Sequence, residues 1–147
     1  MITSEISVTR NRCIMQETTV KWLGDQSYLG RDENGIEIKI NPKPKQDDMV
    51  KPPDLLLMSL GSCTGLFLTP AIKELGLDVN DFEIVLSGEK AANPPALFDA
   101  INIHLKVWGS VTEPQLEQVM IKSHQKCFIL HSLHPDIEIR TTFEIME

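Results

Sequence analysis

The sequence has few basic residues, few aromatic residues and few cysteines. It contains 14 Lys and Arg against 21 Asp and Glu, for a formal net charge of −7 at pH 7. Nucleic acids and anionic membranes attract basic patches, so we expect neither as a partner. Aromatic residues make up only 5% of the chain, and its tryptophans lack the interleaved basic residues of a base-stacking platform.

Three cysteines, Cys13, Cys63 and Cys127, are too few for a disulfide framework, and an odd number allows at most one internal pair with one spectator. The N-terminal segment lacks the basic-then-apolar order of a secretory signal. We therefore expect the chain to stay in the reducing cytoplasm, where structural disulfides are rare. One redox-active pair of thiols, with Cys13 as the spectator, fits this setting.

Repeats, low-complexity tracts and an obvious interdomain linker are also missing. The 147 residues suffice for one compact domain, and 41% hydrophobic residues is an ordinary globular value. We predict a single domain over residues 1–147, with an N-terminal β-meander in 1–41, a loop in 42–53, and a helix-strand-strand-helix-strand order in 54–147. The segment DENG at 32–35 predicts a hairpin turn, because Asn-Gly accepts positive φ angles.

One long apolar run stands out at residues 55–72, where no residue is charged. It just reaches the roughly 18 residues that raise the question of a membrane span. Its glycines, hydroxyl residues and Pro70, and the lack of basic asymmetry in its flanks, favour a helix buried in a soluble core instead. Gly76 is expected to end this helix.

The remaining segments predict two strands, a second helix and a last strand. DFEIVLSGEK and LFDAINIHLKVWG alternate in the manner of antiparallel strands, the second helix is expected to open at Thr112 and to run towards Cys127, and DIEIRTTFEIM closes the chain. The predicted fold class is α+β, with an antiparallel sheet of about six strands.

This arrangement resembles the OsmC/Ohr family, the osmotically inducible protein C-like and organic hydroperoxide resistance proteins. The resemblance covers residues 20–145 and rests on PPDLLLMSLGSCTGLFL, then EIVLSGE and INIHLKVWG, then a second helix with KCFIL and a closing strand. It implies a sheet that wraps a long buried central helix carrying Cys63, a second helix carrying Cys127, and an intertwined homodimer.

The resemblance also implies an activity, the reduction of organic hydroperoxides in oxidative-stress defence. Cys63 stands where the family has its peroxidatic cysteine, which becomes a sulfenic acid. Cys127 stands where the family has its resolving cysteine, which forms a disulfide with the first, and an external dithiol then restores both thiols. No cofactor is implied.

A thiol in the middle of a helix needs a cationic neighbour, because only the thiolate is nucleophilic and about 3% of a free cysteine is ionised at pH 7. The family uses an arginine on an N-terminal strand and a glutamate at the start of the helix. Arg31 is the first candidate for the arginine, before Arg12 and Arg10. Pro53 occupies the glutamate position, and Asp54 follows it, so the chain resembles a divergent branch.

Other interpretations remain open. Cys63 and Cys127 also suit plain core packing, since free cysteine is among the most buried residue types. Phe67 and Phe128 each lie within one helical turn of a cysteine, where they could line a substrate pocket or simply pack. The alternative function is a non-catalytic dimer that binds a small apolar ligand.

Four potential metal ligands, His124, Cys127, His131 and His134, recur every three or four residues, as on one face of a helix. At 1.5 Å per residue the first and last would stand about 15 Å apart, whereas ligands lie about 2 Å from zinc. We therefore predict no metal site from this stripe.

Overall fold

The computed structural model describes residues 15–43 and 48–147, so Cys13, Arg12 and Arg10 lie outside the described residues. The chain forms two compact units that meet in sequence at Pro52 and Pro53. This boundary falls at the end of the predicted loop.

The N-terminal unit contains a four-stranded sheet. β1 (Thr18–Gly24), β2 (Ser27–Asp32) and β3 (Glu37–Ile40) form an antiparallel meander, and the short β4 (Met49–Val50) pairs in parallel with β3. The predicted turn joins β2 to β3: the Asp32 carboxylate accepts the backbone N–H groups of Asn34 and Ile36, and Gly35 has a φ of +83°. The chemistry of this turn therefore fixes the register of the hairpin.

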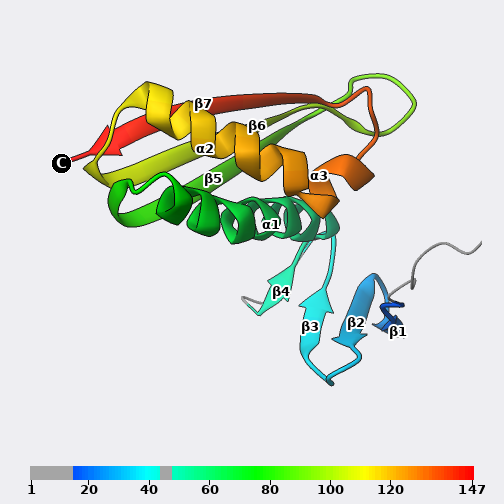
Figure 1. Ribbon diagram of the computed structural model, residues 1–147. Helices are drawn as coiled ribbons and strands as arrows, with labels where there is room; N and C mark the ends of the chain where they lie inside the picture. Colours follow the sequence, from blue (N-terminus) through cyan, green and yellow to red (C-terminus); the bar gives the residue numbers. More distant parts are fainter. Residues whose placement is uncertain (1–14, 44–47) are drawn as a thin grey trace, which may run out of the picture. The chain divides into compact units, whose positions relative to one another are not determined.

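The C-terminal unit has its helices on one face of a three-stranded sheet (Figure 1). The strands β5 (Asp78–Lys90), β6 (Phe98–Ser110) and β7 (Glu138–Met146) lie in the order β5-β6-β7. The helices are α1 (Pro52–Glu74), α2 (Glu113–Lys126) and the short α3 (Phe128–Ser132). β5 and β6 are antiparallel, whereas β7 runs parallel to β6 because α2 and α3 carry the chain back along the sheet.

Helix α1 begins and ends as its sequence predicts. Two prolines and Asp54 occupy its first turn, where a missing amide donor costs little and an acidic side chain suits the helix dipole. Gly76 follows the helix with a φ of +61°, a conformation that glycine adopts without strain. By length and composition alone the helix could cross a membrane, but the core helix of a soluble protein meets the same criterion.

The core of the C-terminal unit lies between the helices and the inner face of the sheet. Alternate residues of β6, from Ile101 to Val107, are at most 1% exposed, and Leu60, Leu68, Leu116 and Val119 of the helices are fully buried against that side. The period of two along β6 thus places one row of side chains in the core and the other row on the opposite face.

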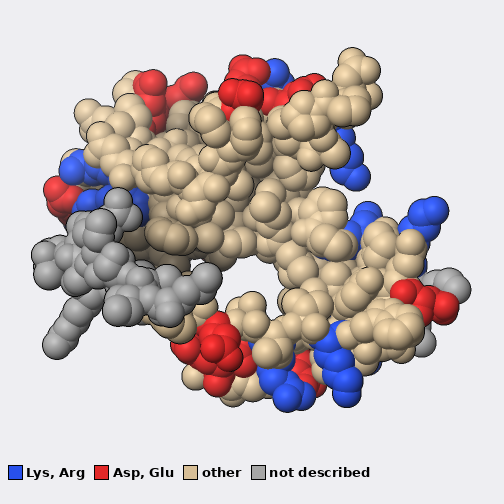
Figure 2. Space-filling view, turned by 90° about the vertical axis from the view of Figure 1, so that its right-hand side faces the viewer, with Lys and Arg blue, Asp and Glu red and all other residues tan. Residues whose placement is uncertain are grey.

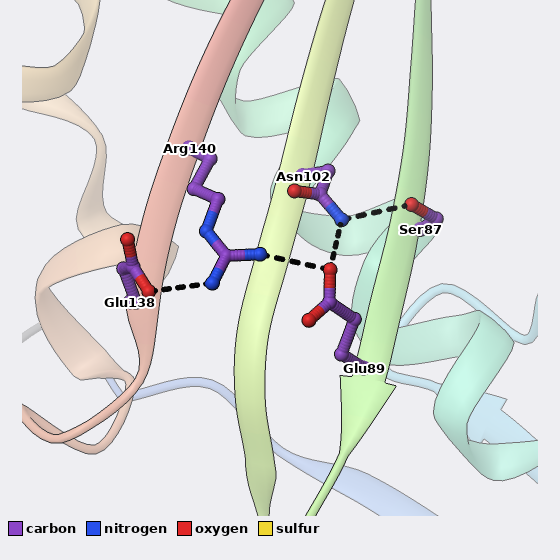
Figure 3. Close-up of polar contacts among 5 residues, drawn as sticks. All are labelled: Ser87, Glu89, Asn102, Glu138 and Arg140. Atoms are coloured by element: carbon purple, nitrogen blue, oxygen red, sulfur yellow. Dashed lines mark hydrogen bonds and ion pairs between the residues drawn. The ribbon is translucent and has the colours of Figure 1, made fainter.

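The outer face of this sheet is polar. Arg140 of β7 bonds Glu138 beside it and reaches across β6 to Glu89 of β5, which also accepts a hydrogen bond from Asn102 (Figure 3). The two carboxylates raise the pKa of Arg140, while Asn102 and Arg140 lower that of Glu89. This face is therefore stable in water without further cover.

The structure corrects three details of the predicted fold. The described strands form a four-stranded and a three-stranded sheet, with parallel pairs in both, instead of one antiparallel sheet of about six strands. α1 is not enclosed, because Met58 and Leu66 on its open face are 58% and 71% exposed. Cys127 does not lie within the second helix, because α2 ends at the residue before it.

Candidate thiol site

Cys63 lies on the buried face of α1, in the middle of the helix. It is 8% exposed and belongs to the same core cluster as Leu60 and Leu68. The next residue, Thr64, is fully buried, and its hydroxyl donates to the Leu60 carbonyl at 2.9 Å. The thiol is thus held by a rigid element in apolar surroundings.

Cys127 occupies the break between α2 and α3. Its backbone is extended, with φ −68° and ψ 105°, and its side chain is fully buried. The sulfur accepts the N–H of Leu130 at 3.5 Å, so it acts as the N-cap of α3, while the N–H of Cys127 closes α2 on the Ser123 carbonyl at 3.0 Å. One residue therefore ends one helix and begins the next.

A buried hydrogen bond ties α2 to α1 beside the thiols. Ser123 Oγ donates to the carbonyl of Thr64 at 2.8 Å, and both residues are fully buried. Ser123 precedes Cys127 by about one helical turn, and Thr64 directly follows Cys63. The bond therefore fixes the two cysteine-bearing segments against each other.

Cys63 and Cys127 lie close enough for their thiols to interact. Burial raises the pKa of Cys127; the Leu130 N–H opposes this shift, the neighbouring Cys63 adds to it, and Thr64 has a smaller lowering effect. Within the described part of the chain, no lysine or arginine contributes to this balance. Cys127 is thus held as a protonated thiol at neutral pH.

The two charged residues expected at the site lie on different elements of the chain. Arg31 belongs to the N-terminal unit and pairs with Glu37 on the next strand, where its Nε lies 2.8 Å from the carboxylate. Asp54 lies nine residues before Cys63 on the same helix, which separates them by about 14 Å along the axis. Their catalytic roles remain predictions.

The two phenylalanines expected near the cysteines differ in environment. Phe67 is half-buried and packs against the core cluster that includes both thiols. Phe128 directly follows Cys127 but is 70% exposed. Phe67 is therefore part of the hydrophobic core, Phe128 presents its ring to the surface, and their substrate-binding roles remain predictions.

The histidine stripe is not one face of one helix, because α2 ends before Cys127. Within residues 15–43 and 48–147, no group of three or more His, Cys, Asp or Glu side chains is arranged to hold a metal ion. His124 is half-buried, and its Nε2 is enclosed without a hydrogen-bond partner in the described structure. Burial, and secondarily the nearby His131, lowers the pKa of His124.

Sequence reasoning missed Ser123 and Thr64. Their signal was positional: each lies within about one helical turn of a cysteine, and a hydroxyl group buried beside it needs a hydrogen-bond partner. The sequence does not predict the end of α2 at Lys126, because no helix-ending glycine or proline stands there.

Comparison with known proteins gives consistent matches. Residues 45–142, a segment that includes both Cys63 and Cys127, match the family model for OsmC-like protein. Protein YhfA of Escherichia coli K12 is 25% identical over 132 residues, 88% of this chain and 98% of YhfA.

Solved structures share the fold over most of the chain. A hypothetical protein from Aquifex aeolicus VF5 is 27% identical with a TM-score of 0.77, over 91% of this chain and 98% of that one. An organic hydroperoxide resistance protein from Elizabethkingia anophelis is 19% identical with a TM-score of 0.74, over 93% and 100%. At that identity, the second likeness concerns the fold alone.

The buried His124 predicts a pH-dependent stability. Because its pKa is lower in the folded chain, the unfolded chain binds the proton first as the pH falls. Its contribution to stability is complete above the unfolded pKa of about 6.5 and is lost as the pH drops through the folded pKa.

Urea unfolding between pH 7.5 and pH 5 should show the free energy of unfolding falling, with a shallower fall in His124→Gln. The exposed, non-titrating Gln125→Ala is the control; equal slopes in His124→Gln and the parent would contradict the assignment.

Proposed function

The chain belongs to the OsmC-like protein family, and we propose that it is a thiol-dependent peroxidase that reduces organic hydroperoxides in the cytoplasm. The observation that carries this proposal is the meeting of Cys63 and Cys127 in one buried site, although they are far apart in sequence. A pair of thiols at such close range suits a cycle of oxidation and disulfide formation.

The proposed reaction balances with the two thiols and one hydroperoxide. The Cys63 thiolate attacks the outer peroxide oxygen, the O–O bond breaks, and the alkoxide takes up a proton to leave as an alcohol. Cys63 is then a sulfenic acid. The sulfur of Cys127 attacks that of Cys63, the S–O bond breaks, water leaves, and a disulfide remains. An external dithiol reduces it by thiol–disulfide exchange.

The environment of Cys127 supports this order of events. Burial and the adjacent Cys63 raise the pKa of Cys127, so it is a poor first nucleophile at neutral pH. Its capping bond to Leu130 is 3.5 Å long and weak because sulfur is a poor acceptor, so the sulfur can leave it to reach Cys63. Cys127 is therefore assigned the resolving role and Cys63 the attack.

An arginine beside Cys63 would complete the site. Arg31 is our candidate, with Asp54 as its acidic partner, because the family places an arginine on an N-terminal strand and an acid at the start of the helix. Arg31 is half-exposed and now pairs with Glu37, a type of surface ion pair that contributes roughly 0–1 kcal/mol. Such a weak pairing leaves the guanidinium available for another partner.

The surroundings of Cys63 favour an apolar peroxide. Leu60 and Leu68 lie on the same buried face, and Phe67 packs against the same cluster. Contact with these side chains would bind the hydrocarbon part of an organic hydroperoxide, a gain that hydrogen peroxide cannot make. We assign Phe67 and Phe128 to this substrate surface.

We also propose that the chain works as a homodimer. In the N-terminal unit, the large apolar side chains Val20 and Trp22 are each 65% exposed. In the C-terminal unit, Met58, Ser62 and Leu66 follow one another at helical spacing along the open face of α1. Figure 2 shows that much of the surface in view carries no charge. Apolar surface of this kind is a usual sign of a protein interface, and a second copy is its simplest cover.

The peroxidase proposal predicts distinct defects for the two cysteines. Cys63→Ser should reduce consumption of tert-butyl hydroperoxide to the uncatalysed rate, because it removes the attacking sulfur. Cys127→Ser should complete one turnover and stop as a sulfenic acid, detectable by dimedone adduct mass. Peroxide loss followed with ferrous xylenol orange measures both.

Cys13→Ser is the matched control, since Cys13 is assigned no role, and it should keep the parent rate. Peroxide consumption by Cys63→Ser at the parent rate would rule the proposal out. An intrachain disulfide at Cys63 in peroxide-treated Cys127→Ser without dithiol would remove Cys127 from the resolving role.

The dimer proposal predicts that a charge on the open face of α1 separates the subunits. Leu66→Glu should raise the dimer dissociation constant at least about tenfold, because an unpaired carboxylate would be buried in the interface. Sedimentation velocity across a concentration series measures it. Gln125→Glu, on the exposed side of α2, is the control and should leave the dimer intact. A parent chain that sediments as a monomer at all concentrations would contradict the proposal.

A further inference from the structure

A second feature of the C-terminal unit is a partly open hollow that neither thiol lines. Its volume is about 370 Å³, and it lies between α3, the segment leading into β7, and the inner side of β7. Figure 1 shows α3 at the end of α2, next to the stretch that enters β7. Ligand pockets in proteins span roughly 300–1,000 Å³, so the hollow has room for a small molecule.

The lining combines apolar side chains with three imidazoles. The apolar residues come from α3 and from the segment that enters β7, and the hollow is lined by Leu130, Leu133, Pro135, Ile137 and Ile139 together with His124, His131, His134 and Thr141. Among residues 15–43 and 48–147, no acidic side chain lines it. The exposed lining is more polar than apolar, so the hollow offers several hydrogen-bonding groups beside its apolar side chains.

Hydrogen-bond partners fix the tautomers of two of the histidines. His131 Nε2 lies 3.2 Å from the carbonyl of Gln125, which can only accept, so this nitrogen carries a proton. His134 Nδ1 accepts the N–H of Asp136 at 3.2 Å, so in the neutral ring the proton is on Nε2. His134 therefore has an N–H donor left for another partner.

His124 has unused hydrogen-bonding capacity. Within the described residues its ring makes no hydrogen bond, Nε2 is enclosed by protein, and the residue lines the hollow. A half-buried imidazole without any partner is unusual in a native structure and calls for an explanation. A ligand that accepts a hydrogen bond from Nδ1–H would give the ring one partner, while Nε2 stays enclosed.

We propose that this hollow is a binding site for a small apolar monocarboxylate, whose carboxylate accepts hydrogen bonds from His124 and His134 while its hydrocarbon chain lies against the leucines and isoleucines. A carboxylate has two oxygens and can take both donors at once. His131 Nδ1 donates only when its ring is protonated, so binding at neutral pH does not require it. The site is independent of the thiol chemistry.

One charge opposes this binding. The Asp136 carboxylate lies 3.7 Å from His134 Nδ1, and its side chain is 78% exposed. Solvent screens such a charge strongly, so it weakens binding of an anion without preventing it. Removing the Asp136 charge should therefore strengthen the binding of an anion, which tests whether the ligand is negatively charged.

The test is a titration of the full chain with octanoate at pH 7, followed by the imidazole carbon–proton signals in NMR. We expect a dissociation constant of about 1 mM or tighter, with shifts at His124 and His134 and none at His104 on the outer face of the sheet. His124→Phe and His134→Phe should each weaken binding about fivefold or more. Asp136→Asn should strengthen it, and His104→Phe, the matched control, should leave it unchanged.

Two further probes, an alcohol without the carboxylate and a peptide with a free carboxyl terminus, test which part of the ligand the site recognises. 1-Octanol has the same chain without the carboxylate and should bind at least about fivefold more weakly. Equal affinity for octanol and octanoate, or unchanged octanoate affinity in both folded phenylalanine variants, would overturn the proposal. Binding of acetyl-leucyl-leucine but not of octanoate would show that the site takes a peptide carboxyl terminus, which would overturn the assignment to free acids.

Discussion

The placement of the two cysteines depends on the close approach of α1 and the end of α2. The Ser123 hydroxyl bonds to the Thr64 carbonyl in the core, where water cannot compete, so α2 must stop against the middle of α1. That contact places Cys127 next to Cys63 and leaves the sulfur of Cys127 as the cap of α3. Both thiols are thereby buried while remaining within reach of each other.

A second feature that bears on stability is the apolar surface that stays exposed to solvent in a single chain. The outer face of the three-stranded sheet carries its own polar network, so the apolar surplus lies on the open side of α1 and on the strands of the N-terminal unit. A small sheet with exposed Val20 and Trp22 gains little from burial within the chain and needs another surface for its stability. Arg31, the proposed activator of Cys63, lies on one of those strands, β2, so the dimer proposal and the thiol-site proposal concern the same unit.

Much of the fold could be predicted because its signals are local. The Asp32–Gly35 turn, the proline-rich start of α1 and the alternation along β6 each follow from a few neighbouring residues. The division into two sheets and the parallel position of β7 depend on long-range packing, which no local pattern encodes. The two thiols were predicted from a family resemblance, whereas the Ser123–Thr64 bond required the structure, because a lone serine or threonine on a helix has many ordinary partners.

The most direct measurement is peptide mapping of the product formed when the reduced protein meets one equivalent of tert-butyl hydroperoxide under non-reducing conditions. If Cys63 and Cys127 form one redox site, the product contains one intrachain disulfide that joins the peptides containing Cys63 and Cys127, and a free thiol at Cys13. A product in which Cys63 stays reduced, or in which its disulfide runs to Cys13 or to another chain, would contradict the central claim that these two buried thiols form one redox site.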